Sequence, residues 1–68
     1  MEPFIANFIH RNGDVIASAT LKRNPLPVAE DEALGQADSV EMNHAVRVKR
    51  IEILHDGHVC STLVYRGA

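Results

Sequence analysis

Two turn signals, Asn12-Gly13 and Asp56-Gly57, constrain this 68-residue chain more than any other feature. Each lies between two runs rich in aromatic and β-branched residues. A two-residue hairpin turn of type I′ requires positive φ at both central positions, and these dipeptides tolerate that backbone best. The sequence therefore predicts two antiparallel β-hairpins, over residues 4–22 and 44–66.

A two-residue loop at Asn12-Gly13 would fix the register of the first hairpin. The expected facing pairs are Arg11 with Asp14, His10 with Val15, Phe8 with Ala17, Ala6 with Ala19, and Phe4 with Leu21. One face then combines large rings with small methyl groups, while Ile5, Ile9 and Ile16 fall on the other. Both faces of this hairpin would need cover. A three-residue loop with a bulge is the alternative at Gly13 and at Gly57; it would shift the facing residues by one and, in the second hairpin, lose the pairing of His55 with His58.

The second hairpin shows a break in its alternation. Val46 and Val48 alternate, Lys49-Arg50 intervene, and Ile51 and Ile53 then alternate one step out of phase. A β-bulge at Lys49-Arg50 would return these aliphatic residues to one face. The alternative is a regular strand that is covered on both sides. Either reading requires a second layer over the sheet.

The connector, residues 23–43, differs in composition from both hairpins. It contains Pro25 and Pro27, which a central strand does not tolerate, and it carries five of the nine acidic residues. Proline near a helix start, acids after it and Gly35 as a stop predict a short helix of about two turns over 27–35. An irregular acidic loop is the alternative.

These elements predict a single small domain, residues 1–68, of the α+β class and mainly β. The hairpins would form a four-stranded antiparallel sheet or two packed ribbons. A chain of this size buries little apolar surface and usually needs a disulfide, a metal or a second subunit. Its one cysteine, Cys60, excludes an internal disulfide. We therefore expect a homodimer; the connector is long enough for domain swapping but does not require it, and a compact monomer is the alternative.

The strongest candidate for a chemical site in the sequence is a metal site formed by His55, His58 and Cys60. Across a two-residue turn His55 and His58 face each other, and Cys60 would point to the same side, so zinc is a possible cofactor. A fourth ligand would have to come from His10, His44 or Asp56. The pattern is not a common zinc-site spacing, and such residues are more often exposed polar groups and a small apolar thiol.

The sequence gives weaker support to a catalytic site or a calcium site. Cys60 could act as a nucleophile with His55 or His58 as base, but no oxyanion site or groove accompanies it. The carboxylates of Glu30, Asp31 and Glu32 lack the spacing of a calcium loop. We therefore expect no enzymatic activity and no calcium site.

Basic residues concentrate on the second hairpin at Arg47, Lys49, Arg50 and Arg66. A basic two-stranded ribbon can bind nucleic acid, but the net charge of −2 disfavours that partner. The acidic connector could neutralise the same bases within one chain or between subunits.

The function that best fits the sequence is a small, non-enzymatic protein-interaction module that self-associates. Its strands carry apolar residues on both faces, more than so short a chain can cover by itself. A sheet face or a sheet edge would therefore bind another protein. The alternatives are a metal-binding or redox-sensing protein and a nucleic-acid-binding protein. The N-terminus has no secretory signal and no apolar run could cross a bilayer, so we expect a cytoplasmic location without membrane contact.

Overall fold

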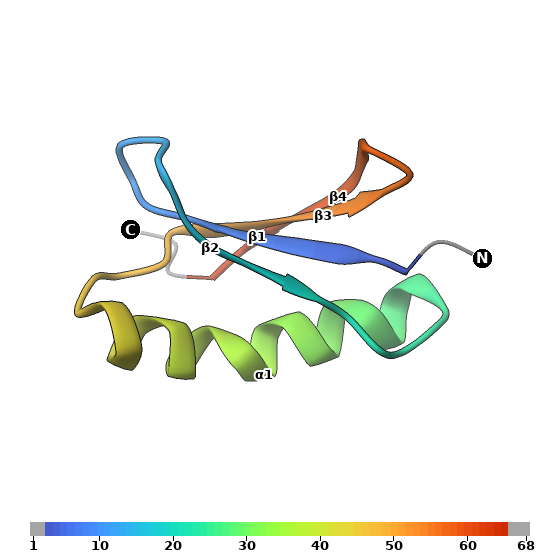
Figure 1. Cartoon of the computed structure of the whole chain (residues 1–68), viewed down its shortest axis with the longest axis horizontal. Helices are drawn as coiled ribbons and strands as arrows, with labels where there is room; N and C mark the ends of the chain where they lie inside the picture. The colour runs from blue at the N-terminus through green and yellow to red at the C-terminus, as the bar shows by residue number, and fades with distance from the viewer. Residues whose placement is uncertain (1–2, 66–68) are drawn as a thin grey trace.

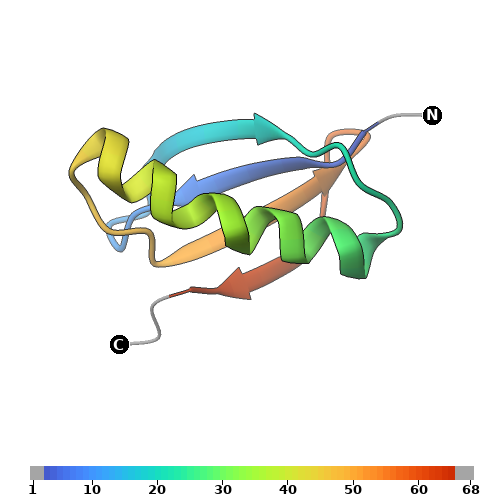
Figure 2. The same ribbon diagram turned by 90° about the horizontal axis from the view of Figure 1, so that it is seen from below.

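The computed structural model describes residues 3–65, which form one antiparallel sheet and one helix. The elements are β1 (Ile5–Ile9), β2 (Val15–Thr20), α1 (Leu26–His44), β3 (Arg50–His55) and β4 (His58–Val64). The strand order is β2-β1-β3-β4, and each neighbouring pair is antiparallel. The helix lies along one side of the sheet (Figures 1 and 2). The two hairpins, the four-stranded sheet and the mainly β class are therefore confirmed, but the predicted start of the second hairpin at residue 44 is wrong, because His44 ends α1 and β3 begins at Arg50.

The hydrophobic core lies between α1 and the sheet. Phe8, Ile51 and Ile53 come from the two central strands, whereas Leu21 follows the edge strand β2 and Val48 precedes β3. The helix contributes only alanines to the fully buried set: Ala29, Ala33 and Ala37. Because these side chains are small and spaced by four residues, one stripe of the helix can approach the sheet closely.

The helix is longer than the two turns expected from the sequence. It spans 19 residues and passes through Gly35, which is exposed and does not end it. A glycine inside a helix costs only about 1 kcal/mol, and the burial of the alanine stripe outweighs that cost. The helix ends at His44, after which Ala45 adopts the left-handed conformation with φ 55°.

The turn of the first hairpin differs from the expected two-residue loop. His10 N donates to Asp14 O, Gly13 N donates to His10 O, and Gly13 has φ 94°, so the loop contains three residues. The expected pairs of Arg11 with Asp14 and His10 with Val15 are therefore wrong.

A second irregularity restores the register of the first hairpin. Ile9 pairs with Val15 while Phe8 pairs with Ala17, so Ile16 is an extra residue in β2. The longer loop and this bulge compensate each other. The predicted pairs of Phe8 with Ala17 and Ala6 with Ala19 are consequently confirmed.

The second hairpin turns where the sequence indicated. Asp56 and Gly57 both have positive φ, 54° and 81°, and His55 pairs with His58. This is the two-residue loop that the dipeptide predicts.

The start of β3 shows the predicted irregularity at Lys49-Arg50. Lys49 N donates to Ile9 O at 2.9 Å, and Arg50 is the register partner of the same residue. Two consecutive residues thus face one, as in a β-bulge. Val48 and Ile51, three positions apart, are both fully buried as a result.

Candidate interaction surface

The face of the sheet opposite α1 is uncovered by any of residues 3–65, and we call it the open face (Figure 1). Directly paired residues of neighbouring strands point to the same side of a sheet, so the registers divide this face into three rows. The first row contains Thr20, Ile5, Leu54 and Val59. The middle row contains Ser18, Asn7, Glu52 and Thr62. The third row contains Val15, Ile9, Arg50 and Val64.

The two outer rows carry aliphatic side chains that water reaches. The exposed fractions are 40 % for Ile5, 53 % for Val15, 52 % for Val59 and 67 % for Val64. Ile9 is only 2 % exposed although it lies on this face and outside the helix-side core, because it sits between Val15 and Arg50. Each outer row therefore offers apolar surface that a partner could bury.

The middle row is entirely polar. Ser18 Oγ donates to Asn7 Oδ1 at 2.6 Å, and Arg50 Nε lies 3.6 Å from Glu52 Oε2. Asn7 Nδ2 has no acceptor among residues 3–65. The open face thus has a polar middle row between two outer rows that are mainly aliphatic but also contain Thr20 and Arg50. Sequence reasoning missed this pattern because it appears only when the four strands are placed in order.

Both edge strands carry an extra residue, which weakens the sheet edges as pairing sites. Ile16 is the extra residue in β2, and Cys60 is the extra residue in β4, where Ile53 pairs with Ser61 and Leu54 with Val59. Bulges at edges disturb the row of backbone groups that another strand would need. The face is consequently better suited to contact a partner than either edge.

The three residues of the metal hypothesis are only partly brought together. His55 and His58 do face each other, and the His55 ring contacts Phe4 with 5.1 Å between centroids. Cys60 is the bulge residue, so the alternation that would have placed it on the side of His58 is broken. Its Sγ donates to Ile53 O at 3.4 Å.

The described part of the chain contains no group of three His, Cys, Asp or Glu residues that could hold a metal ion. The structure therefore gives the zinc hypothesis no support beyond the facing histidines. His10 and His44, named as possible further ligands, line a hollow of about 330 Å³ at the opposite end of the sheet from the β3–β4 turn.

Three of the four basic residues lie in the described part of the chain, between the end of α1 and the start of β3. Arg50 lies on the open face beside Glu52, and the exposed Arg47 lies in the segment between α1 and β3. The backbone of Lys49 bonds to β1 and to Tyr65. Arg66 lies outside the described residues.

The acidic residues of the connector bind uncharged donors of the same chain. Glu30 Oε2 accepts from Ser61 Oγ, and Asp38 Oδ1 accepts from the Tyr65 hydroxyl, both at 2.5 Å. The carboxylate of Glu32 accepts from the backbone N–H groups of Lys22 and Arg23. These carboxylates anchor α1 to the sheet and its loops, a structural role that also accounts for two of the three residues considered for calcium.

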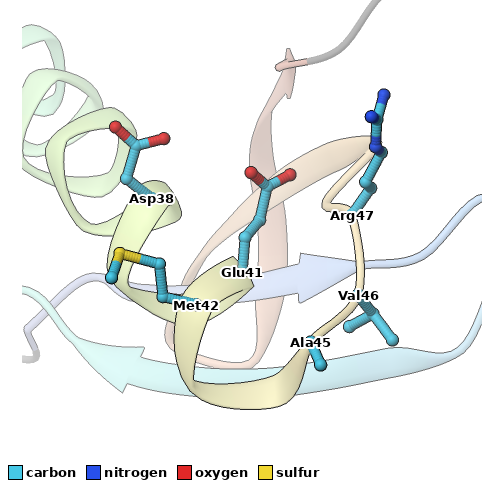
Figure 3. A pocket seen from close by; sticks show the side chains of 6 residues that line it. All are labelled: Asp38, Glu41, Met42, Ala45, Val46 and Arg47. Carbon is cyan, nitrogen blue, oxygen red and sulfur yellow. The ribbon is translucent and has the colours of Figure 1, made fainter.

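A hollow of about 410 Å³ lies at the C-terminal end of α1 (Figure 3). Asp38, Glu41 and Arg47 point their charged ends the same way, above Met42, Ala45 and Val46. Asp38 already binds Tyr65, and Glu41 Oε2 accepts from Val48 N at 2.8 Å. The two carboxylates therefore hold the fold together at this point.

Comparison with known proteins adds no family. No protein-family model matches the sequence, and neither a curated protein nor a solved structure matches the chain. Within residues 3–65, α1 lacks the combination of length and apolar character that a membrane-spanning helix needs.

Proposed function

We propose that this protein is a small, non-enzymatic interaction module that self-associates through the open face. The observation that carries the proposal is the pair of outer rows, in which Ile5, Val15, Val59 and Val64 are each at least 40 % exposed. Apolar surface that is clustered on one face and bordered by polar groups is typical of interaction sites.

The size of the domain supports the same conclusion. A 68-residue chain has a small core, and here the helix covers one side of the sheet only. A second layer on the open face would bury the exposed aliphatic residues and add to the stability of the domain. A copy of the same chain is the commonest source of such a layer.

The test is the mass of the protein in solution as a function of concentration. Sedimentation equilibrium from about 1 to 300 μM should show a mass that rises above 7.5 kDa toward twice that value. Val64→Asp places a charge in an outer row and should return the protein to the monomer mass across this range.

Met42→Asp is the matched control. Met42 is 82 % exposed, more than Val64, but it lies on α1 rather than on the open face. This variant should associate as the unmodified protein does. A monomer at every concentration, or equal loss of association in both variants, would contradict the proposal.

A further inference from the structure

We infer that the second copy packs face to face on the open face, about a two-fold axis that runs parallel to the strands between β1 and β3. This inference rests on the proposed self-association and adds its geometry. Sheets pack face to face either aligned, at about −30°, or orthogonally, and we infer the aligned class, in which the axis can run along the strands or across them. The polar middle row distinguishes these two arrangements.

An axis across the strands would place each middle-row residue over its own copy. Glu52 would then face Glu52 of the second copy, with two carboxylates opposed in a closing interface. The first row would lie over the third, which sets Leu54 against the charged end of Arg50.

A two-fold axis along the strands places β1 over β3 of the second copy and β2 over β4. Each row then lies over the same row of the second copy. Asn7 then faces Glu52 of the second copy, twice over by symmetry. Because Asn7 Oδ1 already accepts from Ser18, the group it offers is the Nδ2 donor, which has no acceptor within residues 3–65. A carboxylate is a suitable acceptor for that donor.

The outer rows also match under this axis. Ile5 faces Leu54 of the second copy, and Val15 faces Val64, so apolar residues meet apolar residues. Ile9 faces the Arg50 side chain, whose hydrocarbon stem can cover it while the guanidinium stays beside Glu52.

The available area permits a dimer near the lower limit of stable interfaces. The molecule measures 33 × 19 × 18 Å, so the open face covers at most roughly 600 Å² in each copy and at most about 1,200 Å² in both. The bulges at Ile16 and Cys60 disfavour the competing edge-to-edge dimers.

The axis can be read from distances between identical spin labels in the full chain. Cysteines replace Ser18, Thr20 or Thr62 one at a time in a Cys60→Ser background, which is first shown to associate normally. An axis along the strands places β2 and β4 at equal distances from it, so all three positions should give similar separations, about 17 Å between backbones from the usual strand and sheet spacings.

Each other result has a distinct meaning. Shorter separations at Ser18 and Thr62 than at Thr20 would indicate the axis across the strands and overturn this geometry. A short separation on one edge strand and a long one on the other would indicate an edge dimer. In both cases self-association itself would stand. A monomer mass of the Cys60→Ser protein at every concentration would refute the proposed function.

A pair of charge variants tests the Asn7 contact without labels. Asn7→Asp opposes a carboxylate to Glu52 of the second copy and should weaken association roughly tenfold or more. Ser39→Asp adds the same charge at an exposed position of α1, away from the open face, so association should change about twofold at most. Equal effects of the two variants would contradict the contact of Asn7 with the second copy.

Discussion

Glu41, near the end of α1, accepts a hydrogen bond from the backbone N–H of Val48, the fully buried residue that precedes β3. This contact spans the turn from helix to sheet and satisfies a donor that burial removes from water. Hydrogen bonds to the sheet and its loops are also accepted earlier in the helix, by Glu30, Glu32 and Asp38. The acidic character of the connector is therefore largely explained by the attachment of the helix to the sheet.

Glu41→Ala should lower the free energy of unfolding by about 1–3 kcal/mol, because it leaves the Val48 N–H without its acceptor. Glu41→Gln keeps a carbonyl oxygen at the same place and should cost less than half as much. Urea denaturation of both variants measures the difference. Equal destabilisation would show that the charge of Glu41, not its acceptor, is what matters.

Gly35→Ala should raise the free energy of unfolding by about 0.5–1 kcal/mol, because alanine loses less conformational entropy in a helix. No atom lies within 4 Å of a Cβ built at Gly35, so the methyl group has room. Gly13→Ala is the opposite case, since its φ of 94° strains any residue with a Cβ, and it should destabilise the protein. Thermal unfolding of the two variants should shift in opposite directions.

Ala33→Leu should destabilise the protein by about 1–3 kcal/mol, because Ala33 is fully buried where the helix meets the sheet. The larger side chain must push α1 away from the core or adopt an unfavourable rotamer. Ser39→Leu introduces the same side chain at an exposed helical position and should change stability by no more than about 0.5 kcal/mol. Similar losses in both variants, measured by urea denaturation, would contradict close packing at Ala33.

Turn residues made most of the fold predictable from the sequence. Asp56-Gly57 indicated the position of its turn, and the two-residue loop that this dipeptide favours is the one that forms. Asn12-Gly13 indicated the position alone. A three-residue loop uses the same glycine, so the dipeptide does not determine the loop length. The compensating bulge at Ile16 does not change the hydrophobic pattern and could not be predicted from it.

The full length of the helix could not be predicted from local preferences. Gly35 is typical of a helix end, and the alanine stripe is only weakly hydrophobic, so the decisive contribution comes from packing against the sheet. The residues of the open face could not be predicted from the sequence for a related reason. Strand order decides which residues share a row, and strand order depends on contacts between segments far apart in the sequence.

Deletion of Cys60 should leave the fold intact, because it removes the extra residue and allows Leu54–Val59 and Ile53–Ser61 to become consecutive regular pairs. Circular dichroism and urea denaturation should show a native-like variant with stability within about 1 kcal/mol of the original. The regular edge that results should pair more readily with other strands, so this variant should aggregate at lower concentration in light scattering.

Deletion of Asn7 is the control, because the pairing of β1 with β3 contains no bulge at this residue. It moves part of β1 to the opposite face, so that variant should not fold. If both deletions unfold the protein, the extra residue is required for the strand and does not serve only to protect its edge.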